Sequence, residues 1–385
     1  MAIRIPLYDT VTENRQFARD FHAALDRVLA SGRFALGEEL AAFESALAEY
    51  CGTTQAVGVK SGTDALILTL RALGIGRDDE VVTASFTFFA SVEAIMQVGA
   101  RPVFADVEPK TFCLSPDACA AALTAATKAI LLIHVFGHCA NIECFQSLCE
   151  EHNIALVEDA AQALGAAWNG RKLGSLGTAG TFSFYPTKNL SALGDAGAIV
   201  TSDGELANRL RRLRSHGRDA TGRHATLGYN SHMDELQAAI LHAKLGHLDA
   251  ELARRRELAA RYDAELPAEV RRVRGADGCL SNYHQYAIRT DHRDEFRQFL
   301  FDQGIGTGDY YRVPAHNEPA AAAAGPFPSL PETERACKEV VTLPIRPSLT
   351  DEQQKTVIDA IRRFKPACAD VEPLPASVPP PRQSA

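Results

Sequence analysis

The sequence has no apolar run that approaches the length of a membrane span. Its start, Met1-Ala2-Ile3-Arg4, lacks the charged and then apolar order of a signal peptide. It also lacks an excess of positive charge: 48 acidic residues outnumber 40 basic ones, which gives a net charge of −8. Because a nucleic-acid partner requires a basic face, this balance argues against such a partner. We therefore expect a cytoplasmic protein with neither a nucleic-acid nor a membrane partner.

Cysteine and histidine patterns typical of metal sites are absent as well. Among the nine cysteines, Cys139, Cys144 and Cys149 fall five residues apart, which matches neither C-x-x-C nor a zinc pattern. His134 and His138 are four residues apart, but in a strand-to-loop run and not in a helix, so we do not expect them to share a metal. We expect reduced thiols and no metal site.

What the sequence does contain is an alternation of apolar strands and helices from about residue 55 to 215. Several strands are apolar at both alternating positions, as strands covered on both faces must be. This order predicts an α/β fold in which a mostly parallel, seven-stranded sheet lies between helices. The predicted strands are Ala56–Val59, Glu80–Thr83, Pro102–Asp106, Ala129–Phe136, Ile154–Glu158, Thr181–Phe184 and Ala198–Thr201.

At 385 residues the chain is too long for one compact core, so we expect two domains. Residues 1–245 are predicted to hold a helical preface and the large α/β domain, and residues 246–365 a smaller α+β domain. A long helical stretch from Met233 to Leu266, which Pro267 stops, is expected to bridge them. The tail, residues 366–385, is proline-rich without periodicity and is predicted to be disordered. The smaller domain is expected to contain strands at Tyr283–Ile288 and Val340–Leu343 and helices at Asp294–Gln303 and Asp351–Phe364.

Lys188 is the most informative residue. It follows a strand, and its flank Thr181-Phe182-Ser183-Phe184-Tyr185 is apolar and aromatic, so its amine would be partly desolvated. Desolvation lowers the pKa of an amine and favours the neutral, nucleophilic form. Most lysines after a strand are solvated surface residues, but an aspartate about thirty residues upstream changes the interpretation. A lysine that can form a Schiff base and an aspartate that can keep a pyridinium nitrogen protonated are what pyridoxal 5'-phosphate requires.

That aspartate is Asp159, which ends the apolar run Leu156-Val157-Glu158. On its own it reads as an ordinary helix N-cap, a common use of aspartate. With Lys188 in the chain we favour the cofactor role. Gln162, three residues further on, is expected on the same helical face, where it could contact the phenolic oxygen of the ring.

Ser61-Gly62-Thr63-Asp64 lies where a strand turns into a helix. Free backbone N–H groups and the dipole at a helix start bind phosphate well. The motif has neither the Walker nor the G-x-G-x-x-G spacing, so a generic turn is the alternative. Ser183 offers a hydroxyl to the same phosphate, and Phe88 is either a core residue or an aromatic ring that stacks on the cofactor.

In combination these motifs resemble the DegT/StrS family of pyridoxal-phosphate-dependent sugar aminotransferases, which have the aspartate-aminotransferase fold (fold type I). The resemblance extends from about Val28 to Phe364. It rests on residues 31–37, 60–66, 158–162, 183–190, 194–198 and 228–239.

The resemblance implies a role for each matching residue. Lys188 would be the Schiff-base lysine, Asp159 the partner of the ring nitrogen, Gln162 the contact of the ring oxygen, and Phe88 the stacking ring. The residues implied around the phosphate are Gly62, Thr63, Asp64 and Ser183.

Asn230 resembles the residue that reaches the phosphate from the other subunit, which implies a homodimer with shared active sites. Phe34, Tyr311 and His316 match positions on the substrate side. These loop side chains, with Arg218, are expected to determine which substrate binds, but their identities do not indicate which sugar or nucleotide it is.

Three positions depart from the family pattern, which usually has arginine at His232 and glycine at Ser191 and Ala196. We expect these departures to tune the site without abolishing activity. A related branch that dehydrates sugars has histidine in place of the lysine, and Lys188 argues against that branch.

The resemblance implies a transaminase that moves an amino group from an amino acid, L-glutamate, to a keto group of a nucleotide-linked keto-deoxysugar. Two alternatives stay open. One is an aminotransferase for a keto-cyclitol of the inosose type. The other is a regulator that binds pyridoxal phosphate without turnover, which an intact set of Lys188, Asp159 and Gln162 disfavours.

Overall fold

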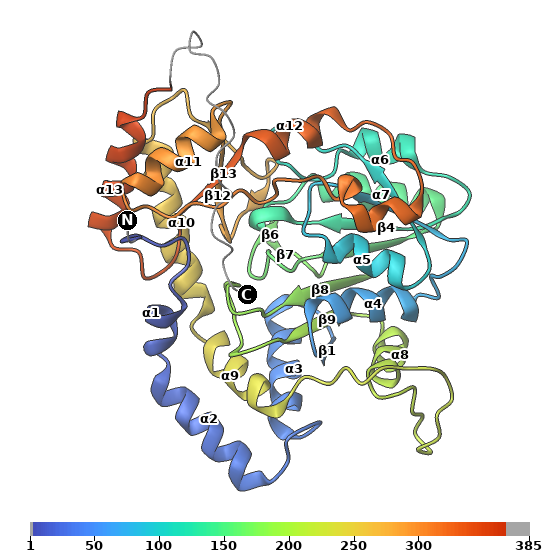
Figure 1. The fold of residues 1–385 in the computed structure, drawn as a ribbon. Coiled ribbons are helices and arrows are strands. Elements are labelled where there is room, and N and C mark those ends of the chain that lie inside the picture. Colours follow the sequence, from blue (N-terminus) through green and yellow to red (C-terminus); the bar gives the residue numbers. More distant parts are fainter. Residues whose placement is uncertain (1–2, 367–385) are drawn as a thin grey trace.

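The computed structural model describes residues 3–366 (Figure 1). All but the first residue of the predicted tail, 366–385, lies outside the described residues. A large body around the central sheet adjoins a smaller one that holds α10 (Leu248–Glu265), α11 (Arg293–Asp302), α13 (Asp351–Arg363), β12 (Tyr286–Arg289) and β13 (Val340–Leu343). Among residues 3–366, none of the helices combines the length and the apolar character that a membrane crossing requires.

The predicted seven-stranded, mostly parallel sheet is confirmed. Its order is β1-β9-β8-β5-β4-β2-β3, and β9 alone among these strands runs antiparallel to its neighbours. Six strands therefore end at one edge of the sheet, which is where open α/β sheets bind ligands. The strands are β1 (Gln55–Val59), β2 (Glu80–Ala84), β3 (Arg101–Ala105), β4 (Thr127–Ile133), β5 (Ala155–Asp159), β8 (Ala179–Ser183) and β9 (Gly197–Thr201).

Both faces of this sheet are covered, which explains why its strands are apolar at both alternating positions. In β4, Ile130 and Leu132 face the core that includes α3 and α7, whereas Ala129 and Leu131 face the core that includes α4 and α5. The covering helices are α3 (Glu38–Cys51), α6 (Pro116–Ala122) and α7 (Ile142–His152) on one face, and α4 (Gly62–Ala72), α5 (Ala90–Gln97) and α8 (Gly204–Arg214) on the other.

The predicted helical stretch from Met233 to Leu266 is interrupted. It forms α9 (Glu235–Leu245) and α10 (Leu248–Glu265), with Gly246 and His247 between them. Glycine is a weak helix former, so it is a natural point for the break. The helical preface consists of α1 (Thr10–Arg15), α2 (Ala18–Ser31) and α3, and it packs along α9 and α10.

A second apolar core lies between α10, α11 and α13 and strands β12 and β13. Ile5 also joins this core and pairs with Ile305, so the start of the chain packs against its C-terminal part. Division of the chain at residues 245 and 246 remains a prediction. The elements of this part are β10 (Arg271–Arg272), β12 (Tyr286–Arg289), β13 (Val340–Leu343), α11 (Arg293–Asp302), α12 (Pro331–Glu339) and α13 (Asp351–Arg363). A separate small sheet contains β11 (Cys279–Leu280), β6 (Ala167–Trp168) and β7 (Arg171–Lys172).

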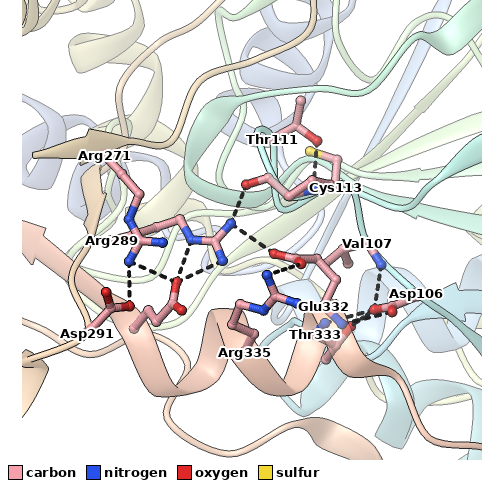
Figure 2. Close-up of polar contacts among 12 residues, drawn as sticks. Asp106, Val107, Thr111, Cys113, Arg271, Arg289, Asp291, Glu332, Thr333 and Arg335 are labelled. Atoms are coloured by element: carbon pink, nitrogen blue, oxygen red, sulfur yellow. Dashed lines mark hydrogen bonds and ion pairs between the residues drawn. The ribbon is translucent and has the colours of Figure 1, made fainter. Parts of the chain in front are cut away.

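Polar contacts join the two cores where α12 meets the loop after β3 (Figure 2). The Asp106 carboxylate accepts the backbone N–H groups of Glu332 and Thr333, at 3.0 and 2.8 Å, at the start of α12. The buried Arg289 of β12 forms ion pairs with Glu332 at 2.9 Å and Glu339 at 2.8 Å. Because each of these buried charges has a partner of opposite sign or a hydrogen-bond donor, the junction fixes the position of the smaller body relative to the sheet.

Candidate active site

Lys188 lies in the loop after β8, and its backbone N–H donates to the carbonyl of Tyr185 at 2.8 Å. The side chain is half-buried, and burial lowers its pKa from 10.5 to about 8, although the negative charge of Asp159 acts in the opposite direction. Within residues 3–366, its Nζ has no hydrogen-bond partner. About a tenth of this amine is therefore neutral at pH 7, far more than for a solvated lysine.

Asp159 ends β5 and is 6% exposed. One carboxylate oxygen accepts the Ser91 hydroxyl at 2.7 Å, and the other accepts the backbone N–H of Ala161 at 3.1 Å. The chain beyond Asp159 forms a turn and no helix, so the alternative role as a helix N-cap does not apply. The two hydrogen bonds fix the orientation of the carboxylate.

Gln162 lies in that turn, so the expectation that it shares a helical face with Asp159 is wrong. Its side chain is instead held by two partners. Its Oε1 accepts the backbone N–H of Phe136 at 2.7 Å, and its Nε2 donates to the hydroxyl of Tyr311 at 2.7 Å. Burial raises the pKa of Tyr311, which keeps the phenol protonated. The structure thus joins a predicted ring contact to a predicted substrate-side residue.

Phe88 is 63% exposed, so the alternative that it is a core residue is wrong. Its ring centroid lies 6.3 Å from that of Tyr311, and the Tyr311 centroid lies 5.9 Å from that of the buried Phe86. Phe34 is 60% exposed, and its carbonyl accepts the backbone N–H of Glu235. The exposed ring of Phe88, beside the polar pair of Tyr311 and Gln162, is the kind of surface that a planar ligand covers. Within residues 3–366, no contact joins the side chain of Phe34 to this group.

The start of α4 packs directly against the end of β8. Ser61 caps the helix by accepting the backbone N–H of Asp64 at 3.1 Å, while the N–H groups of Gly62 and Thr63 belong to the first turn, where no intrahelical acceptor exists. A side chain at Gly62 would place its Cβ only 2.6 Å from that of Ser183. The four residues predicted to hold phosphate therefore lie together, and glycine is required at position 62.

Asn230 is the predicted phosphate contact that the structure does not bring to this group. Its side chain is exposed, and its backbone pairs with Ser215. Within the described part of the chain, no contact joins its side chain to the other predicted residues. The adjacent Ser231 does reach the group, because its hydroxyl donates to Asp64 at 2.6 Å.

His316 lies in a short helical turn, Ala315–Asn317, beside the end of β2. Its Nδ1 is 2.8 Å from the hydroxyl of Ser85, which also accepts the backbone N–H of His316 at 2.9 Å. Burial lowers the pKa of His316, so the ring is neutral at pH 7. The neutral imidazole of His316 therefore lies at the carboxyl end of β2, at the edge of the sheet where the site residues are found.

The three departures from the family pattern have distinct surroundings. Ser191 accepts two hydrogen bonds from the buried ammonium of Lys244, at 2.6 Å to Oγ and 3.0 Å to the carbonyl. Ala196 is fully buried beside the sheet. His232 is half-buried and pairs with the hydroxyl of Ser215 at 3.0 Å, so no ion pair forms at this position. Each departure is accommodated without an unpaired charge.

Asn282 was not found by sequence reasoning, although it connects several site residues. Its amide donates to the carbonyl of Gln162 at 3.1 Å, and its carbonyl accepts the side chain of Asn189 at 3.4 Å. His284 donates its backbone N–H to Asn282 at 2.9 Å, and burial lowers its pKa well below 6.5. No sequence signal marks these residues, because about a hundred positions separate them from Lys188 and Gln162.

Glu158 was also missed, although its place beside Asp159 was a possible signal. It is fully buried and lies 2.9 Å from His134 Nε2. Backbone N–H groups of Gly174, Leu176 and Gly177 also donate to it. Burial alone would raise the pKa of Glu158, but these bonds lower it. Across residues 3–366, no group of three His, Cys, Asp or Glu side chains is arranged to hold a metal.

This donor set fits pyridoxal 5'-phosphate. A half-buried amine without a hydrogen-bond partner can bond to an aldehyde, and a fixed carboxylate can pair with a ring nitrogen. The start of α4 offers N–H groups to an anion, and the exposed ring of Phe88 offers a flat apolar surface.

Comparisons with known proteins agree with this fit. Residues 15–362 match the model of the DegT/DnrJ/EryC1/StrS aminotransferase family. A dTDP-3-amino-3,4,6-trideoxy-alpha-D-glucose transaminase of Streptomyces venezuelae is 44% identical over 94% of this chain and 96% of its own. A protein of Geobacillus stearothermophilus called a pleiotropic regulatory protein is 42% identical over 94% of this chain and 99% of its own.

Among solved structures, the crystal structure of S. venezuelae DesV in complex with a ketimine intermediate has a TM-score of 0.91 and is 44% identical, covering 93% of this chain and 98% of that one. The family match covers nearly all the described elements, including the whole central sheet. It also includes every predicted site residue. The chain thus belongs to the DegT/DnrJ/EryC1/StrS aminotransferase family, has fold type I, and uses pyridoxal 5'-phosphate as its cofactor.

Proposed function

We propose that this aminotransferase moves an amino group from L-glutamate to the keto group of a nucleotide-linked keto-deoxysugar. The observation that carries the proposal is the Lys188 amine, half-buried and without a hydrogen bond, close enough to Asp159 for the two charges to interact. Support for the acceptor comes from the S. venezuelae relative, whose name is that of a dTDP-sugar transaminase.

When bound, the cofactor supplies an electron sink, which makes the hydrogen on the nitrogen-bearing carbon of the substrate acidic. We assign the residues as follows. Lys188 Nζ would bond to the cofactor and, once free, would accept and return the proton at the reacting carbon. Asp159 would hold a proton on the ring nitrogen, and Ser91 orients that carboxylate. Gln162 and Phe88 would position the ring, and the start of α4 with Ser183 would bind the phosphate.

The first test of this proposal uses the half-reactions. Purified holoenzyme mixed with L-glutamate should convert the cofactor to its aminated form, which is followed by absorbance. Addition of a nucleotide-linked keto-sugar should reverse the change and yield an amino sugar. Failure of every amino donor to aminate the cofactor would contradict the proposal.

A second test locates the covalent bond. Borohydride reduction should leave the cofactor's mass on Lys188 and block tryptic cleavage there, so that a tagged peptide of residues 173–209 appears. A tag on any other lysine would refute the assignment of Lys188.

The homodimer with shared active sites is also a proposal. Its support is the position of Asn230, exposed and apart from Lys188 within one chain, next to a serine that contacts Asp64. Lys188→Ala and Asn230→Ala chains should be impaired separately but should regain activity as mixed dimers. In such a dimer, the Asn230→Ala chain keeps Lys188 and the Lys188→Ala chain keeps Asn230. One site is intact only if Asn230 reaches it from the other subunit. Absence of recovery would place Asn230 outside the partner's site.

Two other functions are tested by the same enzyme preparation. A keto-cyclitol of the inosose type, supplied in place of the keto-sugar, distinguishes the two acceptor classes. A regulatory role without turnover has a specific argument in its favour, because the G. stearothermophilus relative is called a regulatory protein. The intact Lys188 and Asp159 disfavour that role, and a Lys188→Ala variant with unchanged biological function would support it.

We further propose that the protein works in the cytoplasm. All eight cysteines in the described part of the chain are free thiols, which is typical of a reducing compartment. Detection of the native protein in an extracellular fraction of intact cells would oppose this.

A further inference from the structure

Cys139 and Cys279, which the aminotransferase chemistry does not use, lie against each other. Cys139 follows the short helical turn after β4 and is fully buried, whereas Cys279 begins β11 and is half-exposed. A tight turn brings the two segments together, because the backbone N–H of Ala276 donates to the carbonyl of Cys139 at 2.9 Å. The N–H of Cys279 in turn donates to the carbonyl of Ala276 at 2.9 Å.

The two thiols interact across this turn. Cys139 belongs to the main buried core cluster, and Cys279 packs against the same cluster. A side chain on Gly275 would place its Cβ 2.6 Å from the Cys279 sulfur and 3.6 Å from the Cys139 nitrogen, so both residues border the same glycine. A hydrogen-bond donor beside a sulfur stabilises its thiolate form.

The two thiols consequently differ in reactivity. The hydrogen bond from the Cys139 side chain lowers the pKa of Cys279, despite burial. The same hydrogen bond, with burial, raises the pKa of Cys139. A thiolate with partial exposure beside a second thiol is the arrangement of a redox-reactive pair.

We propose that Cys279 and Cys139 are a modification site for hydroperoxides, with Cys279 as the nucleophile and Cys139 as the resolving thiol. The Cys279 thiolate attacks one oxygen of the peroxide, the O–O bond breaks, and the other oxygen leaves as water or an alcohol after taking a proton. The Cys139 sulfur then attacks the sulfenic acid on Cys279. An S–S bond forms, and the hydroxyl leaves as water with the thiol's proton. The pair loses two electrons and the peroxide gains them.

The disulfide would join the two segments that hold Gln162. Phe136, three residues before Cys139, donates to the Gln162 side chain, and Asn282, three residues after Cys279, donates to its carbonyl. The modification site is therefore next to the cofactor-facing wall of the active site but outside the reacting groups. Its test is independent of the substrate proposed above.

The experiment uses wild-type holoenzyme treated with hydrogen peroxide, blocked with N-ethylmaleimide without reduction, and digested with trypsin and a glutamate-specific protease. Cleavage after Glu143 separates Cys139 from Cys144 and Cys149, so Cys139 lies in residues 129–143 and Cys279 in residues 275–289. We expect these two peptides to be linked, and the link to disappear after treatment with dithiothreitol.

Three variants sharpen the result. Cys144→Ser removes an exposed thiol outside the pair and should form the same link as the wild type. Cys279→Ser should form none. Cys139→Ser should leave a sulfenic acid on Cys279 that dimedone labels. Wild-type protein in which residues 129–143 and 275–289 stay unlinked, with both thiols recovered as maleimide adducts, would overturn the proposal whether or not the variants fold.

Discussion

Two lysines near the same loop show how one fold treats the same side chain in opposite ways. Lys244 is 4% exposed, and its ammonium donates to Asn14 at 3.2 Å and twice to Ser191, at 3.0 and 2.6 Å. Lys188, three residues before Ser191, has no such partner within residues 3–366. Burial lowers the pKa of both amines.

The difference lies in what happens to the charge. At Lys244 three acceptors replace the water that burial removes, so the ammonium contributes to structure. At Lys188 no acceptor replaces it, so burial lowers the pKa of the amine, and a larger fraction of it is neutral and free to bond to an aldehyde. A buried lysine therefore indicates chemistry only where its acceptors are missing. The following predictions test this contrast.

Replacing Lys188 by alanine should have the largest effect. Loss of the amine removes both the covalent bond to the cofactor and the proton carrier, so the rate of the glutamate half-reaction should fall by roughly 10⁴-fold or more. Single-turnover absorbance measurements test this. Lys244→Met serves as the matched control, and an equal loss in both variants would erase the contrast between the two lysines.

Asp159→Asn should come next. The amide cannot hold a proton on the ring nitrogen, and the loss of this electrostatic contribution should lower the half-reaction rate by about 10²–10³-fold. Ser91→Ala removes only one of the hydrogen bonds to the carboxylate and should cost less. A Ser91→Ala variant slower than Asp159→Asn would show that the carboxylate has no role of its own.

The pH dependence of cofactor capture reports directly on Lys188. In the apoenzyme its pKa is about 8, so the rate of covalent reconstitution should level off above pH 8 and fall about tenfold for each unit below it. Because the charge of Asp159 raises that pKa, Asp159→Asn should move the midpoint to lower pH. A midpoint near 10 in stopped-flow traces would mean that the amine is solvated.

Lys244→Met should affect stability more than chemistry. It leaves the half-buried Asn14 and the buried Ser191 without their donor, so the free energy of unfolding should fall by about 1–3 kcal/mol in a urea titration. The half-reaction rate should change much less than in Lys188→Ala. Lys355→Met, on the exposed face of α13, is the control and should be neutral. A neutral Lys244→Met would mean that its hydrogen bonds contribute nothing.

Ser191→Gly, which restores the residue usual in the family, should have the smallest effect. Lys244 loses one acceptor but keeps the carbonyl at position 191, so a loss of about 1 kcal/mol is expected. Thermal unfolding of the apoenzyme measures it. Increased stability would show that the serine was selected for another reason.

The sequence predicted the sheet well because burial on both faces leaves a direct record in apolar residues. Strands β2, β4, β5 and β9 begin and end within about three residues of the predicted bounds. The break at Gly246 was not predicted, since a single glycine inside a helical pattern is often tolerated. Helices α6, α7 and α12 were also missed as separate elements, because their polar faces give weaker sequence patterns than the buried strands do.

Site prediction succeeded where chemistry and chain position coincide, as at Lys188 and Asp159, both of which follow strands. It failed for contacts that depend on tertiary structure. The Lys244 contact with Ser191 spans 53 positions, and that of Asn282 with Gln162 spans 120. Phe88 could not be assigned to core or surface, because an isolated aromatic residue leaves the same sequence pattern in either place.

The contact of Gly62 with Ser183 has a consequence for how the enzyme responds to acidity. It brings peptide amides to the place where we propose the phosphate binds. Peptide amides keep their protons from mildly acidic to strongly alkaline solution, so these donors stay available while the reactivity of the neighbouring amine varies with pH. A change of acidity in this range should therefore alter turnover without removing the amide donors that anchor the cofactor.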